Sequence, residues 1–248
     1  MADRNEIIKF CEEYLKVSEF KDYCKNGLQV EGKDKVKTII IGVSISRKLI
    51  KEAINKKADM IIVHHGIFGN LIGEPPVIKG YVKNRLKLLL ENNINLAGFH
   101  LPLDAHPAIG NNISLCKLLG VKNAKPFSIG FWGNLDKATD INNFVKTVND
   151  KLKTNSYLLA AGPEKIKKVG IVSGGSSPDF QDAFESGADT YLCGDIRESV
   201  IRAAEEIGIN IINAGHYNTE KLGIINLGEL IAKKFKVNAK FVDIPCDI

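Results

Sequence analysis

The chain has 248 residues, of which 44% are hydrophobic and 25% are charged, and it contains 22 glycines and 8 prolines. This composition is typical of a globular protein and excludes collagen, a coiled coil and a mainly disordered chain. The formal net charge of +5 at pH 7 is mildly basic and falls short of a polybasic tail. The length accommodates one large domain or two domains of about 125 residues.

Hydrophobic runs and cysteines give little sign of membrane or disulfide chemistry. No apolar run reaches the roughly 18 residues that a membrane helix needs. The first residues, Met1–Glu6, lack the basic segment and apolar core of a signal peptide. The five cysteines are widely spaced and form no CxxC motif, so neither a disulfide framework nor a structural zinc knuckle is indicated. We therefore expect a cytoplasmic protein that does not contact membranes.

In chain order, the first half alternates predicted strands and helices. They are a strand at Thr38–Val43, a helix at Ser46–Lys57, a strand at Met60–Val63, a helix at Val82–Asn92 and a strand at Asn95–Phe99. A segment rich in glycine and proline, Gly66–Val82, is predicted to be a loop.

The second half follows the same order. It has a strand at Val169–Val172, a helix at Asp179–Ser186, a strand at Thr190–Cys193, a helix at Glu198–Ile207 and a strand at Ile209–Asn213. Alternating strands and helices predict largely parallel sheets with helices on their faces. In such sheets, functional sites lie at the carboxyl ends of the strands.

The two halves are also similar in sequence, which indicates an internal repeat. The segment Lys35–His65 matches Lys165–Asp195, and the similarity continues downstream. Matched pairs include Asp59 with Asp189, Asn95 with Asn210, His100 with His216, and Asp104 with Glu220. We therefore predict an α/β fold of two similar α/β halves, residues 1–127 and 128–248, joined near Phe127–Asp140.

Four of the five histidines follow predicted strand ends. His64 and His65 follow the second strand, His100 follows the third, and His216 follows the last strand of the second half. An acid lies four residues beyond two of these histidines, at Asp104 and Glu220.

Each of these patterns is weak when taken alone. A histidine at a strand end can simply be hydrogen-bonded, and a His-x3-Glu pair can be an exposed ion pair or a helix-terminal acid. Three of these histidines together with the two carboxylates would form a mixed nitrogen and oxygen ligand set that suits Zn, Fe, Mn or a similar divalent ion. Because five protein ligands exceed what one open zinc site takes, we expect two ions that activate a shared water.

Three further features admit structural explanations. His106 precedes a proline and is interpreted as a loop residue or a group that faces substrate. The segment Ser173–Asp179 could hold a phosphate on its backbone N–H groups, but it fits better as a tight turn with Ser177 as helix N-cap and Pro178 in the first helical position. Trp132 is interpreted as core or hinge packing in the join.

The chain resembles the NIF3 family, also known as GTP cyclohydrolase 1 type 2 homologues, over essentially its whole length. The motifs that carry the resemblance are Asn26–Gly32, His64–Gly66, His100–Pro107, Gly110–Asn112, His216 with Glu220, and Phe241–Pro245.

The resemblance implies two α/β domains with a dinuclear metal cleft between them. The implied ligands of two divalent ions, of unknown identity, are His64, His65, Asp104, His216 and Glu220. His100 is implied to lie close by, either as a residue that supports the ligands or as a catalytic proton-transfer group. A toroidal homohexamer with its metal sites facing an inner cavity is implied as well, and the C-terminal segment from about 223 to 248 could pack on the first domain.

Two hypotheses of function follow. The first is a metal-dependent hydrolase of a small nucleotide-like substrate, resembling an enzyme that opens the imidazole ring of GTP and releases formate. The alternative is a ring-shaped binding or scaffold protein with structural or regulatory metals, for which nucleic acid is the candidate partner because an oligomer multiplies the basic charge.

Overall fold

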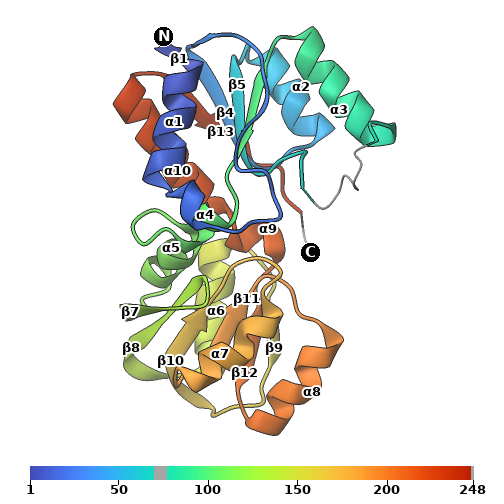
Figure 1. Ribbon diagram of the computed structural model, residues 1–248. Helices are drawn as coiled ribbons and strands as arrows, with labels where there is room; N and C mark the ends of the chain where they lie inside the picture. The colour runs from blue at the N-terminus through green and yellow to red at the C-terminus, as the bar shows by residue number, and fades with distance from the viewer. Residues whose placement is uncertain (70–76, 247–248) are drawn as a thin grey trace. The chain divides into compact units, whose positions relative to one another are not determined.

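The computed structural model describes residues 1–69 and 77–246. Part of the predicted loop, residues 70–76, lies outside the described residues. The fold is α/β, and the chain divides into two compact units (Figure 1). Unit 1 comprises Met1–Leu103 and Ile224–Ile244, and unit 2 comprises Asp104–Gly223 with the last residues from Pro245. This division differs from the predicted boundary after residue 127.

Unit 1 contains a five-stranded sheet with the strand order β13-β4-β5-β6-β2. Its strands are β13 (Asn238–Phe241), β4 (Thr38–Ser44), β5 (Met60–His65), β6 (Asn95–Gly98) and β2 (Gly27–Val30). Strands β13, β4, β5 and β6 are parallel, and β2 pairs antiparallel to β6. The pairing of β13 with β4 explains why the segment from Ile224 belongs to unit 1. Two short strands, β1 (Ala2–Asp3) and β3 (Lys35–Val36), form a separate antiparallel pair.

Helices cover both faces of this sheet (Figure 1). On one face, α2 (Arg47–Asn55) and α3 (Gly80–Glu91) pack their apolar residues against Ile40 and Ile61. On the other face, α10 (Lys221–Phe235) passes so close to β4 that a Cβ on Gly228 would lie 2.8 Å from Ile41 Cγ1. Helix α1 (Arg4–Tyr14) packs against α10 through Phe10 and Phe235, whose ring centroids are 5.6 Å apart. The short helices η1 (Val17–Glu19) and α4 (Leu101–Ala105) complete the helices of this part of the chain.

Unit 2 contains a six-stranded sheet with the strand order β7-β8-β10-β11-β12-β9. Its strands are β7 (Lys122–Phe127), β8 (Gly130–Asp140), β10 (Lys165–Ile171), β11 (Thr190–Cys193), β12 (Asn210–Asn213) and β9 (Tyr157–Leu159). The three central strands β10, β11 and β12 are parallel, as predicted, whereas β7, β8 and β9 add antiparallel pairs at the two edges.

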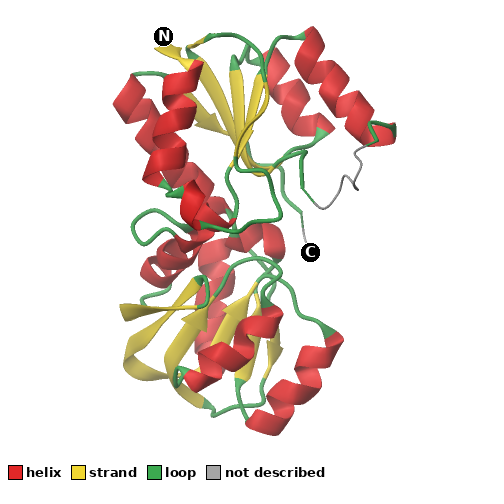
Figure 2. Cartoon of the chain, viewed as in Figure 1, coloured by secondary structure: helices red, strands yellow, loops and turns green. Residues whose placement is uncertain are grey.

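Alternate residues of the central strands pack on opposite faces of this sheet, because successive side chains of a strand point to opposite sides. Leu192 and Ile212 pack with α5 (Asn111–Leu118) and α6 (Ile141–Leu152). Their neighbours Tyr191 and Ile211 pack with α7 (Phe180–Glu185) and α8 (Glu198–Ile207). The remaining helices of unit 2 are η2 (Ser177–Asp179) and α9 (His216–Thr219). Figure 2 shows the resulting alternation of helices and strands.

The predicted join near Phe127–Asp140 is not a linker. It contains the whole of β8, which pairs with both β7 and β10 inside the sheet of unit 2. A Cβ on Gly133 would lie 2.5 Å from the carbonyl oxygen of Lys122, so the close approach of β7 requires a glycine there. Trp132 belongs to this strand and lies opposite Gly170.

None of the helices within residues 1–69 and 77–246 combines the length and the apolar character needed to cross a bilayer.

Candidate metal centre

Three histidines of unit 1 converge at the carboxyl ends of neighbouring parallel strands. His64 and His65 are the last residues of β5, and His100 follows β6. Each histidine offers one ring nitrogen, and these nitrogens lie within 4.8 Å of one another. Strand ends therefore gather the three side chains as the sequence predicted. His64 is 1% exposed and His100 is 4% exposed, so two of the rings lie in the protein interior.

Neighbouring groups hold the Nδ1 atoms of the histidine pair. His64 Nδ1 lies 2.8 Å from the carbonyl oxygen of Phe99. Because a carbonyl only accepts hydrogen bonds, this Nδ1 carries the proton, and Nε2 carries the lone pair of the neutral ring. His65 Nδ1 lies 2.9 Å from Ser44 Oγ at the end of β4. Both rings are thereby oriented to offer Nε2.

His100 is held by residues of the segment that precedes β2. Its Nδ1 lies 3.0 Å from Asp22 Oδ1, its Nε2 lies 3.3 Å from the Tyr23 hydroxyl, and its backbone N–H donates to Asn26 Oδ1 at 2.7 Å. Burial alone would raise the pKa of Asp22, but hydrogen bonds from His100, the Cys24 N–H and Asn26 lower it to about 2. An ionised Asp22 therefore fixes the orientation of the His100 ring.

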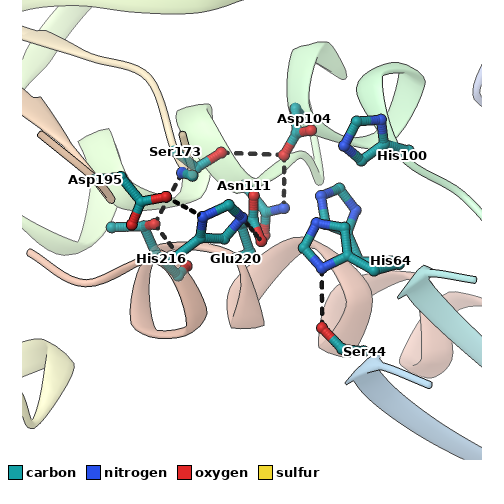
Figure 3. A network of polar contacts seen from close by, with 12 residues as sticks. Ser44, His64, His100, Asp104, Asn111, Ser173, Asp195, His216 and Glu220 are labelled. Atoms are coloured by element: carbon teal, nitrogen blue, oxygen red, sulfur yellow. Dashed lines mark hydrogen bonds and ion pairs between the residues drawn. The ribbon is translucent and has the colours of Figure 1, made fainter. Parts of the chain in front are cut away.

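In unit 2, Asp104 is held inside a network of polar side chains (Figure 3). It is only 3% exposed. Its Oδ1 accepts hydrogen bonds from Asn111 Nδ2 at 2.8 Å and from Ser173 Oγ at 3.0 Å. Asn111 in turn accepts from the N–H of Gly223 at 2.7 Å, at the start of α10. These bonds fix the orientation of the Asp104 carboxylate.

His216 lies between two carboxylates (Figure 3). Its Nδ1 lies 2.6 Å from Asp195 Oδ2, and its Nε2 lies 3.2 Å from Glu220 Oε2, one turn farther along the chain. Burial would lower the pKa of His216, but Glu220 and Asp195 raise it to about 9. A divalent ion at Nε2 would displace the proton that the two acids stabilise there.

The turn after β10 is built around Glu220. Gly174 has a φ of +64°, and a Cβ there would overlap Glu220 Oε1. The N–H of Gly174 donates to Thr219 Oγ1 at 3.0 Å. Ser177, predicted as an N-cap, instead accepts a hydrogen bond from the N–H of Arg197, and Ser176 occupies the cap position. The glycine in this turn therefore leaves the space that the Glu220 carboxylate occupies.

Within unit 2 the predicted donors converge. Asp104 and Glu220 each offer an oxygen, and these two oxygens lie within 4.8 Å of each other. His216 pairs directly with Glu220. His106 lies in a turn, where its Nδ1 accepts the N–H groups of Ala108 and Ile109, and it is not part of the clustered donor groups found among the described residues. The combination of the unit 1 histidines with the unit 2 donors stays a prediction.

Sequence reasoning missed the residues that orient the histidines. For Asp22 and Tyr23 the sequence carried no signal, because they lie in a segment without regular periodicity. For Asp195 the sequence did carry a signal, because the predicted repeat aligns Asp195 with His65. In the second half, the residue aligned with His65 therefore contacts the ring of a proposed metal donor, since Asp195 lies beside His216 Nδ1.

Comparisons with known proteins identify one family and relatives that are similar over nearly the whole chain. The model of a family described as Duf34/NIF3 (NGG1p interacting factor 3) matches residues 2–247. A protein of Haemophilus influenzae called "GTP cyclohydrolase 1 type 2 homolog" is 40% identical over 96% of this chain and 97% of its own length. A Pyrococcus horikoshii protein with the same name is 39% identical over 98% of both chains.

Solved structures show the same fold. A protein called ybgI, described as of unknown function, superposes with a TM-score of 0.94 at 37% identity and full coverage of both chains. Reduced HcgD from Methanocaldococcus jannaschii superposes with a TM-score of 0.84 at 26% identity over 98% of both chains.

Proposed function

The chain belongs to the Duf34/NIF3 family, and we propose that it is a divalent-metal-dependent hydrolase of a nucleotide-like substrate, with GTP as the first candidate. His64, His65, Asp104, His216 and Glu220 would hold two divalent ions. The names of its close relatives, "GTP cyclohydrolase 1 type 2 homolog", support GTP as the first substrate to test.

One observation carries the proposal. In each of the three proposed histidine ligands, Nδ1 is held by another group, which is a carbonyl for His64, a hydroxyl for His65 and a carboxylate for His216. Metal-binding histidines typically have this second contact, which fixes the tautomer and directs the other nitrogen at the ion. The two carboxylates Asp104 and Glu220 add hard oxygen donors. The donor set therefore fits Zn, Fe or Mn.

Bound divalent ions would supply a water that loses its proton near neutral pH. The protein's own part is to orient the donors and to move protons. His100 is placed for proton transfer, because its Nδ1 is fixed by Asp22 and its Nε2 meets the Tyr23 hydroxyl. We assign His100 the role of acid or base toward the substrate, with Asp22 as the residue that positions it.

The test combines metal analysis with an assay of GTP turnover. Protein purified without added metal or chelator should contain close to two divalent ions per chain, and the His64→Ala/His216→Ala double variant should lose most of them. The parent should release formate from GTP, and the His100→Ala variant should retain its metal but lose at least about 100-fold in turnover. A parent that binds no metal after reloading would contradict the metal centre. A metal-loaded parent that leaves GTP and a nucleotide panel intact would contradict the hydrolase.

The proposal also includes a homohexamer with its metal sites facing an inner cavity and a cytoplasmic location. These stay predictions. The comparisons do not favour the alternative of a nucleic-acid-binding scaffold protein.

A further inference from the structure

Unit 2 contains a cavity of about 690 Å³ that does not include any of the proposed metal donors. This volume suits one small molecule. The cavity lies between the loop after α6, strand β9, the end of β12 and helix α9. Its lining residues are Lys153, Thr154, Asn155, Tyr157, Asn213, Gly215 and Asn218.

The most informative lining residue is Asn218. It is only 7% exposed, and its side-chain amide hydrogen-bonds to no residue within the described parts of the chain. Its amide is not among the fully buried side-chain atoms that lack a partner in the described residues, so it is accessible from the cavity, where a ligand can replace water as its hydrogen-bond partner. Because Asn218 lines the cavity, a molecule in the cavity is its natural partner.

The second amide is already oriented. Asn213 Oδ1 accepts a hydrogen bond from the N–H of Gly215 at 3.1 Å, which leaves its NH2 group to donate elsewhere. Tyr157 lies directly opposite Asn213 in the β9–β12 ladder and is 49% exposed. The cavity thus combines amide groups with an accessible aromatic ring.

The residues that line the cavity carry only positive charge. Lys153 is its only charged residue, and no carboxylate lines the cavity. Lys153 forms no ion pair with any residue in the described ranges, and it occupies the C-cap of α6 in a left-handed conformation with a φ of 57°. An ammonium group without a paired carboxylate favours an anionic ligand, and lysine commonly binds phosphate.

We propose that this cavity binds a nucleoside monophosphate. Lys153 pairs with the phosphate, Asn213 and Asn218 hydrogen-bond to the edge of the base, and Tyr157 stacks on the base. Asn218 is two residues from His216 on α9, and residues at this spacing do not share a helix face. The ligand therefore contacts α9 away from the metal donor, and binding requires neither the metal nor hydrolysis.

Calorimetric titration of the full-length protein with GMP, guanosine and inorganic phosphate tests the proposal. GMP should bind the parent, and guanosine and phosphate should each bind at least tenfold more weakly. The Asn218→Leu and Lys153→Ala variants should each lose at least tenfold in GMP affinity. Lys151→Ala is the matched control, because Lys151 is an exposed lysine of α6 that does not line the cavity, and it should bind GMP like the parent.

Other results would overturn the proposal. They are no binding of GMP at millimolar concentration, phosphate binding as tight as that of GMP, or equal losses in Lys151→Ala and Lys153→Ala. If Asn218→Leu fails to fold, Lys153→Ala still decides, because its side chain is exposed. His64→Ala separates this proposal from the hydrolase, since it should lose metal and still bind GMP.

Discussion

The four histidines of the candidate site differ in what meets their second ring nitrogen. All four have Nδ1 held by a neighbouring group, but in His100 the Nε2 atom also lies 3.3 Å from the Tyr23 hydroxyl. In His216 the Nε2 atom instead faces the carboxylate of Glu220. This difference supports the different roles proposed for identical side chains, proton transfer for His100 and metal binding for His216.

Asp22 is the residue on which the geometry of His100 most depends. Its carboxylate accepts from His100 Nδ1, from the N–H groups of Cys24 and Leu101, and from Asn26 Nδ2. In Asp22→Asn, one oxygen becomes an NH2 group that faces these donors. We expect a loss of about 2 kcal/mol in the free energy of unfolding at pH 7, measured by urea denaturation.

The same substitution has a characteristic pH dependence. The pKa of Asp22 is lowered from 3.8 to about 2, so its stabilising effect is complete above pH 4 and is lost as the pH falls toward 2. The difference between parent and Asp22→Asn should therefore shrink over this range. The exposed Asp150→Asn should differ from the parent by less than about 0.5 kcal/mol at every pH. A pH-independent loss in Asp22→Asn would contradict the assignment.

Gly174 offers a second residue-scale test, because it combines a positive φ with direct contact to Glu220. Gly174→Ala should cost about 1 kcal/mol from backbone strain and should also displace the Glu220 carboxylate. The bound metal should fall to half or less of the parent value, as measured by elemental analysis. Gly120→Ala is the control, since Gly120 has a φ of +75° and open space around its Cα. Gly120→Ala should lose a similar amount of stability and keep its metal. Equal metal content in the two variants would refute the role given to Glu220.

At the scale of elements, paired residues of the predicted repeat make equivalent hydrogen bonds. Asp59 Oδ2 accepts the backbone N–H groups of residues 37–38, and Asp189 Oδ2 accepts those of residues 167–168. In both units, the aspartate directly before one parallel strand thus bonds to the backbone of the neighbouring parallel strand, just before or at the first residue of their paired region. These bonds are consistent with the internal repeat, which stays a prediction.

The central strands could be predicted from sequence, and the edge strands could not. Thr190–Cys193 is a short apolar run between turn signals, and it forms β11 with the predicted bounds. Strand β8 contains Gly130 and Gly133, which break the apolar pattern and resemble a linker. Its partner β7 is largely polar and exposed, since it lies at the sheet edge. Edge pairing depends on contacts between segments, which local periodicity does not record.

The close packing of α10 on β4 gives an element-scale prediction. A glycine in an open helical position usually gains stability when replaced by alanine, by about 1 kcal/mol. At Gly228 the new Cβ would press on Ile41, which is fully buried. We therefore expect Gly228→Ala to lose about 1 kcal/mol or more in thermal or urea unfolding. In a double-mutant cycle, Ile41→Ala should relieve part of this loss; a stabilised Gly228→Ala would show that the two elements pack loosely.

At the scale of the whole molecule, the predicted ligands are divided between the two units. His64 and His65 belong to unit 1, and Asp104, His216 and Glu220 belong to unit 2. Strand ends and the His-x3-acid spacing are local signals that pointed to these residues, and their role as metal ligands stays a prediction. The sequence carried no signal for Asp22, and the repeat marked Asp195 without its partner, because the contacts with His100 and His216 arise only when distant segments meet.

This division makes metal binding a test of the proposal at the scale of the whole chain. If the same ions bind donors from both units, they stabilise both units together, because ligands that bind only the folded state raise its stability. The metal-loaded protein should unfold in one calorimetric transition. Chelation should lower the Tm by on the order of 10 °C and separate the transitions of the two units. The His64→Ala/His216→Ala double variant should resemble the chelated parent, whereas His106→Ala, altered in a turn outside the donor set, should keep the full response to chelator. A parent whose unfolding is indifferent to chelation would show that the five residues do not bind metal as one centre.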